Sequence, residues 1–358
     1  MTNRLHLDPL LLLGILALCG LGLVILYSAS GEDIETIWRQ AIRIGLACGV
    51  LLVLAQVPPA QLARLAGWIY AASLLLLILV LVMGHIGKGA QRWLVLGPFS
   101  FQPSELLKLA VPILLASYLA KVTLPPRLWH VLIAVSAVLV PAVLIGKQPD
   151  LGTALLVLCG GFTVLFVAGL RWWWIFGMSG IALACMPVLW FFMHDYQRAR
   201  VLTFLDPGSD PLGSGYHIIQ STIAIGSGGL YGKGWLNGTQ SHLEFLPERS
   251  TDFIFAVYAE EFGLAGVLLL IGLYLLVVIR GLIIASKAQD TFGKLLASGL
   301  VAIFFVYVFV NMGMVAGQLP VVGVPLPLIS LGGTSIVTLM AGFGILMSIH
   351  THRRLLSD

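Results

Sequence analysis

The chain has 358 residues, of which 59% are hydrophobic and only 10% are charged. A water-soluble domain carries about 25% charged residues, so this composition excludes a protein whose whole surface faces water. The net charge of +4 gives no indication of nucleic-acid binding. The four cysteines lie in apolar stretches, without the spacing of zinc ligands or disulfides. The composition therefore predicts a polytopic helical membrane protein.

Uncharged apolar runs recur along the sequence, each close to the roughly 20 residues that a membrane-spanning helix needs. They are Pro9–Gly31, Ile44–Ala63, Leu65–Gly87, Leu128–Gly146, Leu151–Leu170, Trp172–His194 and Phe262–Ile279. The first run is too long for the apolar part of a cleavable signal peptide, so we expect it to remain as a helix. Leu295–His352 contains no Asp, Glu, Lys or Arg and supplies two more spans, which the prolines of Gln318–Leu328 separate.

One further span has to include charged residues. The apolar run between Lys108 and Lys121 is too short to cross a membrane, so this helix must begin near Pro103 and contain Glu105. The fold class that follows is an all-α polytopic membrane protein with about ten transmembrane helices. We expect a single transmembrane domain over residues 1–358, with both termini on one side.

The largest segment that is not apolar, residues 194–251, lies between the seventh and eighth expected spans. Loops of this length in compact proteins usually carry function. Three short basic segments, Lys121–Arg127, Arg280–Lys294 and His350–Asp358, are typical of cytoplasmic loops and tails. They predict cytoplasmic termini, which places the large loop on the extracytoplasmic side.

Two pairs of opposite charge stand at the outer edge of expected spans. Glu105 and Lys108 are three residues apart, so they share a helix face and can form an ion pair. Charges within a membrane are costly and usually face an interior cavity, so this pair predicts a polar cleft. An inert ion pair at the interface would explain the same spacing. Lys147 and Asp150 form a similar pair, although Asp150 could simply cap the next helix.

Asp252 opens the expected span Phe253–Ile279. The helix N-terminus stabilises its ionised form, whereas desolvation at the membrane boundary favours its neutral form. A carboxylate between these two effects can accept a proton at neutral pH, as a general base must. The alternative is a helix-terminal charge without chemistry. Glu260 and Glu261 lie two turns further along, where they could join a polar cavity, a proton path or a network with Lys108.

The segment Gly87–Glu105 is expected to be an outer loop, which either binds an anion through Lys88 and Arg92 or anchors at the interface through Trp93. No nucleotide-binding motif and no nucleophile elbow is present in the sequence.

Five segments, in this order, resemble the SEDS family (shape, elongation, division and sporulation proteins) over almost the whole chain. They are FQPSELLK, KQPDLGTALL, DPLGSGYHIIQSTIAIGSGGLYGKGW, FLPERSTDFIFAVYAEEFG and GVPLPLISLGGTS. The short N-terminus and the ending SIHTHRRLLS are most similar to the elongation branch, and the division branch is the close alternative. Leu331 stands where the family usually has Tyr.

The resemblance implies a peptidoglycan glycosyltransferase of the bacterial inner membrane that polymerises lipid II, a disaccharide-pentapeptide on undecaprenyl pyrophosphate. It implies that Asp252 is the catalytic base. The candidates for substrate binding are Glu105, Lys108, Arg92, Lys88, Lys147, Asp150, Glu248 and Arg249. No nucleotide cofactor is expected because the pyrophosphate is already on the substrate, but a divalent cation, Mg²⁺ or Mn²⁺, could accompany it.

The same resemblance implies a class B penicillin-binding protein, a transpeptidase, as partner, with MreC, MreD and RodZ as further candidates. Two other functions are possible. A flippase that moves lipid II across the bilayer would also need a polar cleft, and a structural scaffold would also belong to a wall-synthesis complex. Asp252→Ala distinguishes them, because only a polymerase should lose glycan synthesis from purified lipid II while it still folds.

Overall fold

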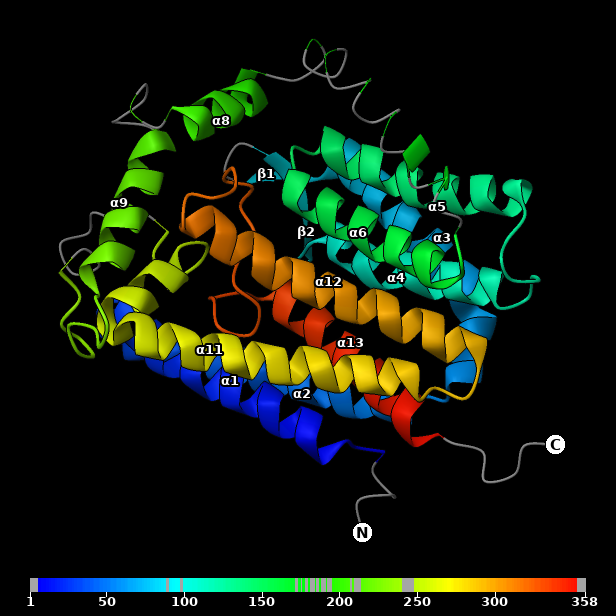
Figure 1. The fold of residues 1–358 in the computed structure, drawn as a ribbon, viewed down its shortest axis with the longest axis horizontal. Helices are drawn as coiled ribbons and strands as arrows, with labels where there is room; N and C mark the ends of the chain where they lie inside the picture. The colour runs from blue at the N-terminus through cyan, green and yellow to red at the C-terminus, as the bar shows by residue number, and fades with distance from the viewer. Residues whose placement is uncertain are drawn as a thin grey trace.

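The computed structural model describes residues 6–87, 90–96, 99–170, 195–206, 214–239 and 248–352, and isolated residues at 173–174, 176–177, 180, 184, 187, 191 and 208. Helices dominate this part of the chain (Figure 1). They are α1 (Pro9–Ala29), α2 (Ile34–Gln56), α3 (Pro59–Met83), α4 (Pro103–Leu119), α5 (Leu128–Lys147), α6 (Leu151–Val167), α8 (Asp195–Leu205), α9 (Ser214–Ser227), α11 (Ile254–Ser286), α12 (Thr291–Val315) and α13 (Thr334–Thr351). Among the described residues, seven helices are long and apolar enough to cross a membrane, which confirms the all-α polytopic class.

The long helices run side by side between two ends of the molecule (Figure 1). We call the end where α1 begins and α13 finishes the terminal end, and the opposite one the loop end. At the terminal end the ring of His6 stacks on that of His352, with 3.9 Å between their centroids. Both described ends of the chain, at His6 and His352, therefore lie on one side, in agreement with the prediction. The expected seventh span, Trp172–His194, lies outside the described residues except for isolated positions.

The second and third helices differ from their predicted bounds. α2 begins at Ile34, capped by the carboxylate of Asp33, and contains the exposed Arg39. The break between α2 and α3 falls at Pro58, so the predicted span Ile44–Ala63 straddles a turn. The charges misled the prediction because an exposed arginine near a helix end reaches the membrane surface and does not mark a helix boundary.

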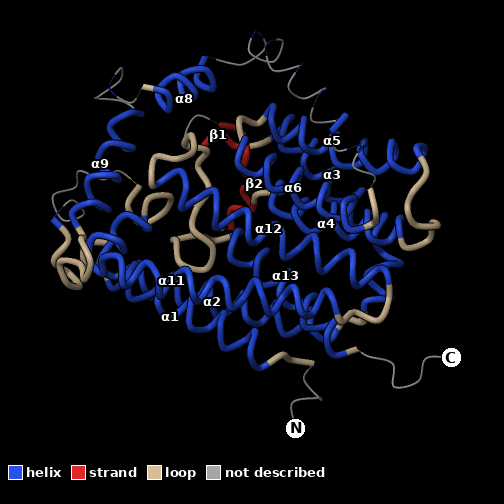
Figure 2. The backbone as a smooth tube through the Cα atoms, viewed as in Figure 1, coloured by secondary structure: helices blue, strands red, loops and turns tan. Residues whose placement is uncertain are grey.

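α4 begins at Pro103, as predicted, where the missing N–H of proline costs no helical hydrogen bond. The segment before it is not the plain loop that the sequence predicted. It forms a three-stranded antiparallel sheet of β1 (His85–Gly87), β2 (Ala90–Leu96) and β3 (Phe99–Phe101), in the order β1-β2-β3 (Figure 2). Strand pairing satisfies backbone N–H and C=O groups that would otherwise need water.

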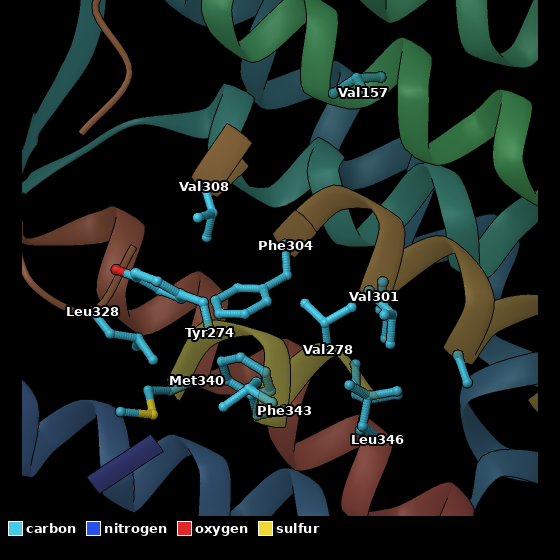
Figure 3. Packing of buried hydrophobic residues seen from close by; sticks show 14 of the residues in the cluster. Val157, Tyr274, Val278, Val301, Phe304, Val308, Leu328, Met340, Phe343 and Leu346 are labelled. Atoms are coloured by element: carbon cyan, nitrogen blue, oxygen red, sulfur yellow. The ribbon is translucent and has the colours of Figure 1, made fainter. Parts of the chain in front are cut away.

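The core between α11, α12 and α13 is built from interlocking apolar and aromatic side chains (Figure 3). The ring centroid of Phe304 lies 5.9 Å from that of Tyr274 and 5.1 Å from that of Phe343. Such ring pairs add to the stabilisation from burial. The Tyr274 hydroxyl donates a hydrogen bond of 2.6 Å to the carbonyl of Pro327. This bond ties the connection between α12 and α13 to the core.

That connection, residues 316–333, folds back into the bundle, and we call it the re-entrant segment. Residues 326–330 are buried, and Leu328 points into the same core as Tyr274 (Figure 3). The backbone of α1 approaches so closely at Gly22 that a Cβ there would lie 2.8 Å from the Cα of Ile329. The re-entrant segment thus forms an inner wall at the loop end.

Candidate active site

A cavity of about 460 Å³ opens at the loop end, where segments far apart in the sequence meet. Its walls come from β2, α4, α6, α8, α12, the start of α13, the re-entrant segment and the turn before α11. Its charged and polar lining residues include Arg92, Gln102, Glu105, Asp150, Arg200, Glu248, Thr251, Asp252 and Tyr307. A polar cavity of this size is what a membrane-embedded binding site for a headgroup would provide.

Asp252 lies in the turn just before α11, which begins at Ile254. Its side chain borders the cavity. Facing it is Gly323 of the re-entrant segment, where an added Cβ would lie 3.6 Å from Oδ2 of Asp252. The absence of a side chain at Gly323 therefore keeps space beside the carboxylate. This is the arrangement that the sequence predicts: a carboxylate at a helix N-terminus beside a hydrophilic slot.

The predicted pair of Glu105 and Lys108 is present, and both side chains are buried in α4. The Nζ of Lys108 lies 2.6 Å from Oε1 of Glu105 and 4.6 Å from the ring centroid of Tyr307. Glu105 and Tyr307 line the cavity, whereas Lys108 lies behind them and lines a small apolar crevice. The ammonium of Lys108 therefore neutralises Glu105, and it does not face the cavity.

Asp150 is the helix cap that one of its two predicted interpretations expects, and it also lines the cavity. It caps α6, where Oδ1 accepts a hydrogen bond of 3.3 Å from the N–H of Thr153. It is also buried in the cavity wall, where Oδ2 accepts a bond of 2.7 Å from Nε2 of Gln102. Asp150 thereby joins the start of α6 to the start of α4.

Arg92 projects from β2 into the cavity wall. Its Nε donates a hydrogen bond of 2.9 Å to the carbonyl of Gln148, and its Nη2 donates to the carbonyl of Pro149. Both carbonyls belong to the turn between α5 and α6. A guanidinium has five N–H groups, so two bonds to backbone oxygens leave others for an anion.

Besides Lys108, three further substrate-binding candidates are not among the described residues that line the cavity. Lys147 is the last residue of α5 and is exposed, and no ion pair joins it to Asp150 within the described residues. Arg249 does not line the cavity; its Nη2 would lie 3.5 Å from a Cβ on Gly31. Lys88 lies outside the described residues.

Glu248, in contrast, lines the cavity, and its Oε2 accepts a hydrogen bond of 2.9 Å from the hydroxyl of Thr251. This bond connects a cavity carboxylate to the turn that carries Asp252.

Of the three roles left open for Glu260 and Glu261, a network with Lys108 does not occur among the described residues, where both carboxylates contact other side chains. Oε1 of Glu260 lies 2.7 Å from Nζ of Lys233, and Oε1 of Glu261 accepts a hydrogen bond from the hydroxyl of Ser28. Two residues further on, α11 has a break at Gly263, whose φ of 64° and ψ of −164° are outside the helical region. Since Ser28 lies in the last turn of α1, Glu261 is at the loop end.

Sequence reasoning missed Arg200 and Tyr307. Arg200 belongs to α8, in the large loop 194–251, and its only signal was the basic stretch QRAR. Tyr307 stands alone in an apolar run of α12, where only its hydroxyl could have suggested a polar neighbour.

The sequence matches the family of FtsW, RodA and SpoVE, described as "Cell cycle protein", over residues 9–355. The chain belongs to this family. The match confirms the resemblance to the SEDS family, and it covers the cavity and every long helix around it.

Within the FtsW, RodA and SpoVE family, the chain is 55% identical over 356 residues to the peptidoglycan glycosyltransferase MrdB of Escherichia coli K12, an alignment that covers 99% of this chain and 96% of MrdB. Two solved structures are similar. One, from "Structural coordination of polymerization and crosslinking by a peptidoglycan synthase complex", gives a TM-score of 0.85 at 38% identity and covers 97% of this chain and 99% of that one. The other, the rod shape determining protein RodA of Thermus thermophilus, gives 0.73 at 34% identity and covers 96% of each chain.

Proposed function

We propose that this chain is a peptidoglycan glycosyltransferase that polymerises lipid II during cell elongation, with Asp252 as the general base. The observation that carries the proposal is the place of Asp252, whose carboxylate borders a polar cavity at the start of a membrane helix. The identity of 55% to a relative named peptidoglycan glycosyltransferase supports the reaction class and the elongation branch over the division branch.

The reaction exchanges one bond at the anomeric carbon of a sugar. The hydroxyl oxygen of the acceptor sugar forms the new bond, while the bond to the lipid pyrophosphate breaks and the pyrophosphate leaves with the electron pair. A sugar hydroxyl is a weak nucleophile, so it needs a base to take its proton. Asp252 lines the cavity in the turn before α11. We assign it this role because a helix N-terminus stabilises the ionised form of a nearby carboxylate, which is the form that accepts a proton.

The leaving pyrophosphate gains negative charge, which a nearby cation stabilises. Among the described residues, the cations that line the cavity are Arg92 and Arg200. A guanidinium can bind a phosphate with two parallel hydrogen bonds. We therefore assign the pyrophosphate to these two arginines. Lys108, in contrast, is already neutralised by Glu105.

A divalent cation fits this cavity only in company with the substrate. Among the described residues, no three His, Cys, Asp or Glu side chains gather closely enough to hold an ion on their own. Mg²⁺ is often held by one or two carboxylates together with substrate phosphates, and Asp150 and Glu248 are the carboxylates that could share it. Such an ion would offset charge on the pyrophosphate. Addition of EDTA, then of Mg²⁺ or Mn²⁺, to the polymerisation assay tests this assignment.

The chain is a multi-pass membrane protein, and we place it in the bacterial inner membrane with the terminal end in the cytoplasm and the cavity on the periplasmic side. The short basic segments at the terminal end support this orientation. The partner we propose is a class B penicillin-binding protein, supported by the similarity to a chain of a peptidoglycan synthase complex. MreC, MreD and RodZ stay predictions from the sequence.

The decisive experiment is a lipid II polymerisation assay with the purified chain and its partner. Because a general base contributes about 10²–10⁴-fold, Asp252→Asn should reduce the rate by that factor. Asp33→Asn is the matched control, since Asp33 also stands at a helix N-terminus of the loop end but does not line the cavity. An asparagine caps a helix as well as an aspartate does. Normal glycan strands from Asp252→Asn would rule out the base.

The flippase and the scaffold make different predictions in the same system. A flippase would move lipid II across liposomes while the wild-type chain makes no polymer with any partner. A scaffold would tolerate charge substitutions in the cavity without loss of cell growth.

A further inference from the structure

Three consecutive carbonyl oxygens, those of residues Ser250–Asp252, each accept a hydrogen bond from outside α11. Their donors are, in order, the N–H of Leu331 at 2.9 Å, the hydroxyl of Ser330 at 2.6 Å and Nδ2 of Asn311 at 2.9 Å. Two of these donors lie in the re-entrant segment and the third in α12. The backbone that carries Asp252 is therefore attached residue by residue to two other elements.

Asn311 is fully buried in α12. Besides the carbonyl of Asp252, its Nδ2 donates to the carbonyl of Val324, at 2.6 Å. Since both partners are carbonyl oxygens, a flipped amide would face them with its own oxygen, so only one orientation can bond to both. Val324 lines the cavity on the side of the re-entrant segment. Asn311 thus fixes the spacing between the two cavity walls that meet at Asp252.

Ser330 joins three elements through one residue. Its hydroxyl donates to Thr251 and accepts a hydrogen bond of 2.7 Å from the N–H of Leu326, within the re-entrant segment. Its carbonyl accepts a bond of 3.3 Å from Nε2 of Gln40 in α2. A buried hydroxyl that is used as both donor and acceptor has a fixed rotamer, because each bond restricts its direction.

We propose that Asn311 and Ser330 are positioning residues that hold the carboxylate of Asp252 toward the cavity by fixing the backbone on which it stands. Neither side chain needs to contact the substrate. The inference rests on the proposed role of Asp252 as base. A base displaced by about 1 Å can lose about 10²-fold in rate, so small shifts of this turn should be visible in kinetics.

The test measures kcat and KM for lipid II polymerisation by the full-length chain with its partner. Asn311→Ala and Ser330→Ala should each lower kcat by about 10- to 100-fold. Because neither side chain lines the cavity, KM should stay within about twofold of wild type. Ser117→Ala is the matched control. Ser117 is 6% exposed, as Ser330 is, and its hydroxyl donates a bond of 2.8 Å to the carbonyl of Ala63, far from the cavity at the terminal end.

The control should lose a similar amount of thermal stability and keep its kcat. A folded Ser330→Ala protein with wild-type kcat overturns the inference, even if Asn311→Ala fails to fold. An equal loss of kcat in Ser117→Ala also overturns it, because the effect would then be general destabilisation. Activity in Asp252→Asn would instead remove the proposed base, so the failures of the two proposals can be told apart.

Discussion

At the scale of single residues, the two cavity arginines come from different parts of the chain. Arg92 is held by the turn between α5 and α6, whereas Arg200 comes from α8 in the large loop. The loop therefore supplies a positive charge that the bundle alone does not have at this cavity wall. Binding of the anionic headgroup should depend on both.

We expect Arg200→Ala to raise KM for lipid II by about 10-fold or more, since a hydrogen bond to a charged group contributes roughly 1.5–3 kcal/mol. Arg198→Ala is the control. Arg198 lies in the same helix, donates to the carbonyl of Phe191 and does not line the cavity. Equal KM values for the two variants would contradict the assignment of Arg200.

The buried ion pair in α4 should behave as a unit. Removal of one partner from a buried pair costs about 3–5 kcal/mol, because the other charge is left uncompensated. Lys108→Met should therefore lower the thermal midpoint in detergent strongly, while the double substitution Glu105→Gln with Lys108→Met should recover much of the loss. A double variant less stable than Lys108→Met would show that the charges are not coupled.

The sequence could predict the acidic residues of the cavity better than the other residues that line it. Asp252, Glu105 and Asp150 stood out because a charge beside an apolar run needs an explanation. Arg200 and Tyr307 did not, since their place in the cavity depends on how distant segments pack. From its spacing, Lys147 was the expected ion-pair partner of Asp150, but it is the last residue of α5 and its side chain is exposed.

At the scale of elements, α1 and the re-entrant segment pack backbone against backbone at Gly22. A Cβ there would lie 2.8 Å from the Cα of Ile329 and 2.9 Å from the carbonyl oxygen of Leu328. Both are backbone atoms, which cannot rotate away. We expect Gly22→Ala to displace the re-entrant segment and to lower both the thermal midpoint and the polymerisation rate.

Gly20→Ala is its control, because a Cβ at Gly20 would meet nothing within 4 Å. In a helix interior alanine is favoured over glycine by about 1 kcal/mol, so this variant should be at least as stable as wild type. A Gly22→Ala protein as stable and active as Gly20→Ala would show that the close approach is not needed.

Helix existence was easier to predict than helix ends. The apolar runs located α1, α5, α6, α12 and α13 well, since these helices carry few charges. The turn at Pro58 was missed because charged residues, and not prolines, were used as boundaries there. The break at Gly263 was missed because a single glycine inside an expected span does not by itself predict a break. The break depends on residues 228–234 packing against α11.

At the scale of the whole molecule, contacts between charged side chains hold three helices together at the terminal end. Oδ2 of Asp8 accepts hydrogen bonds of 3.0 Å from Nε and 2.6 Å from Nη2 of Arg280, and it lies 3.0 Å from Nδ1 of His350. These contacts connect the start of α1 to the C-terminal parts of α11 and α13. Burial would raise the pKa of Asp8, but the bonds from Arg280 and from the N–H of Leu11 outweigh it, and the pKa lies below its ordinary value.

A lowered pKa in the folded state means that Asp8 stabilises the fold above the unfolded-state value of about 3.9 and loses this contribution as the pH falls below it. At pH 7, Asp8→Asn should therefore lower the thermal midpoint, and the difference from wild type should shrink below about pH 4. Asp290→Asn, at the N-cap of α12, is the control with a small expected effect. A difference that stays constant down to pH 3 would contradict this account.

The stacked rings of His6 and His352 also bring the two described ends of the chain together. A short linker could join them without crossing the bilayer, so the chain is suited to circular permutation. New ends could then be opened in the turn between α11 and α12, residues 287–290, which lies on the same side. Such a circular permutant should assemble the same bundle and keep its catalytic chamber, although synthesis would start with a different helix.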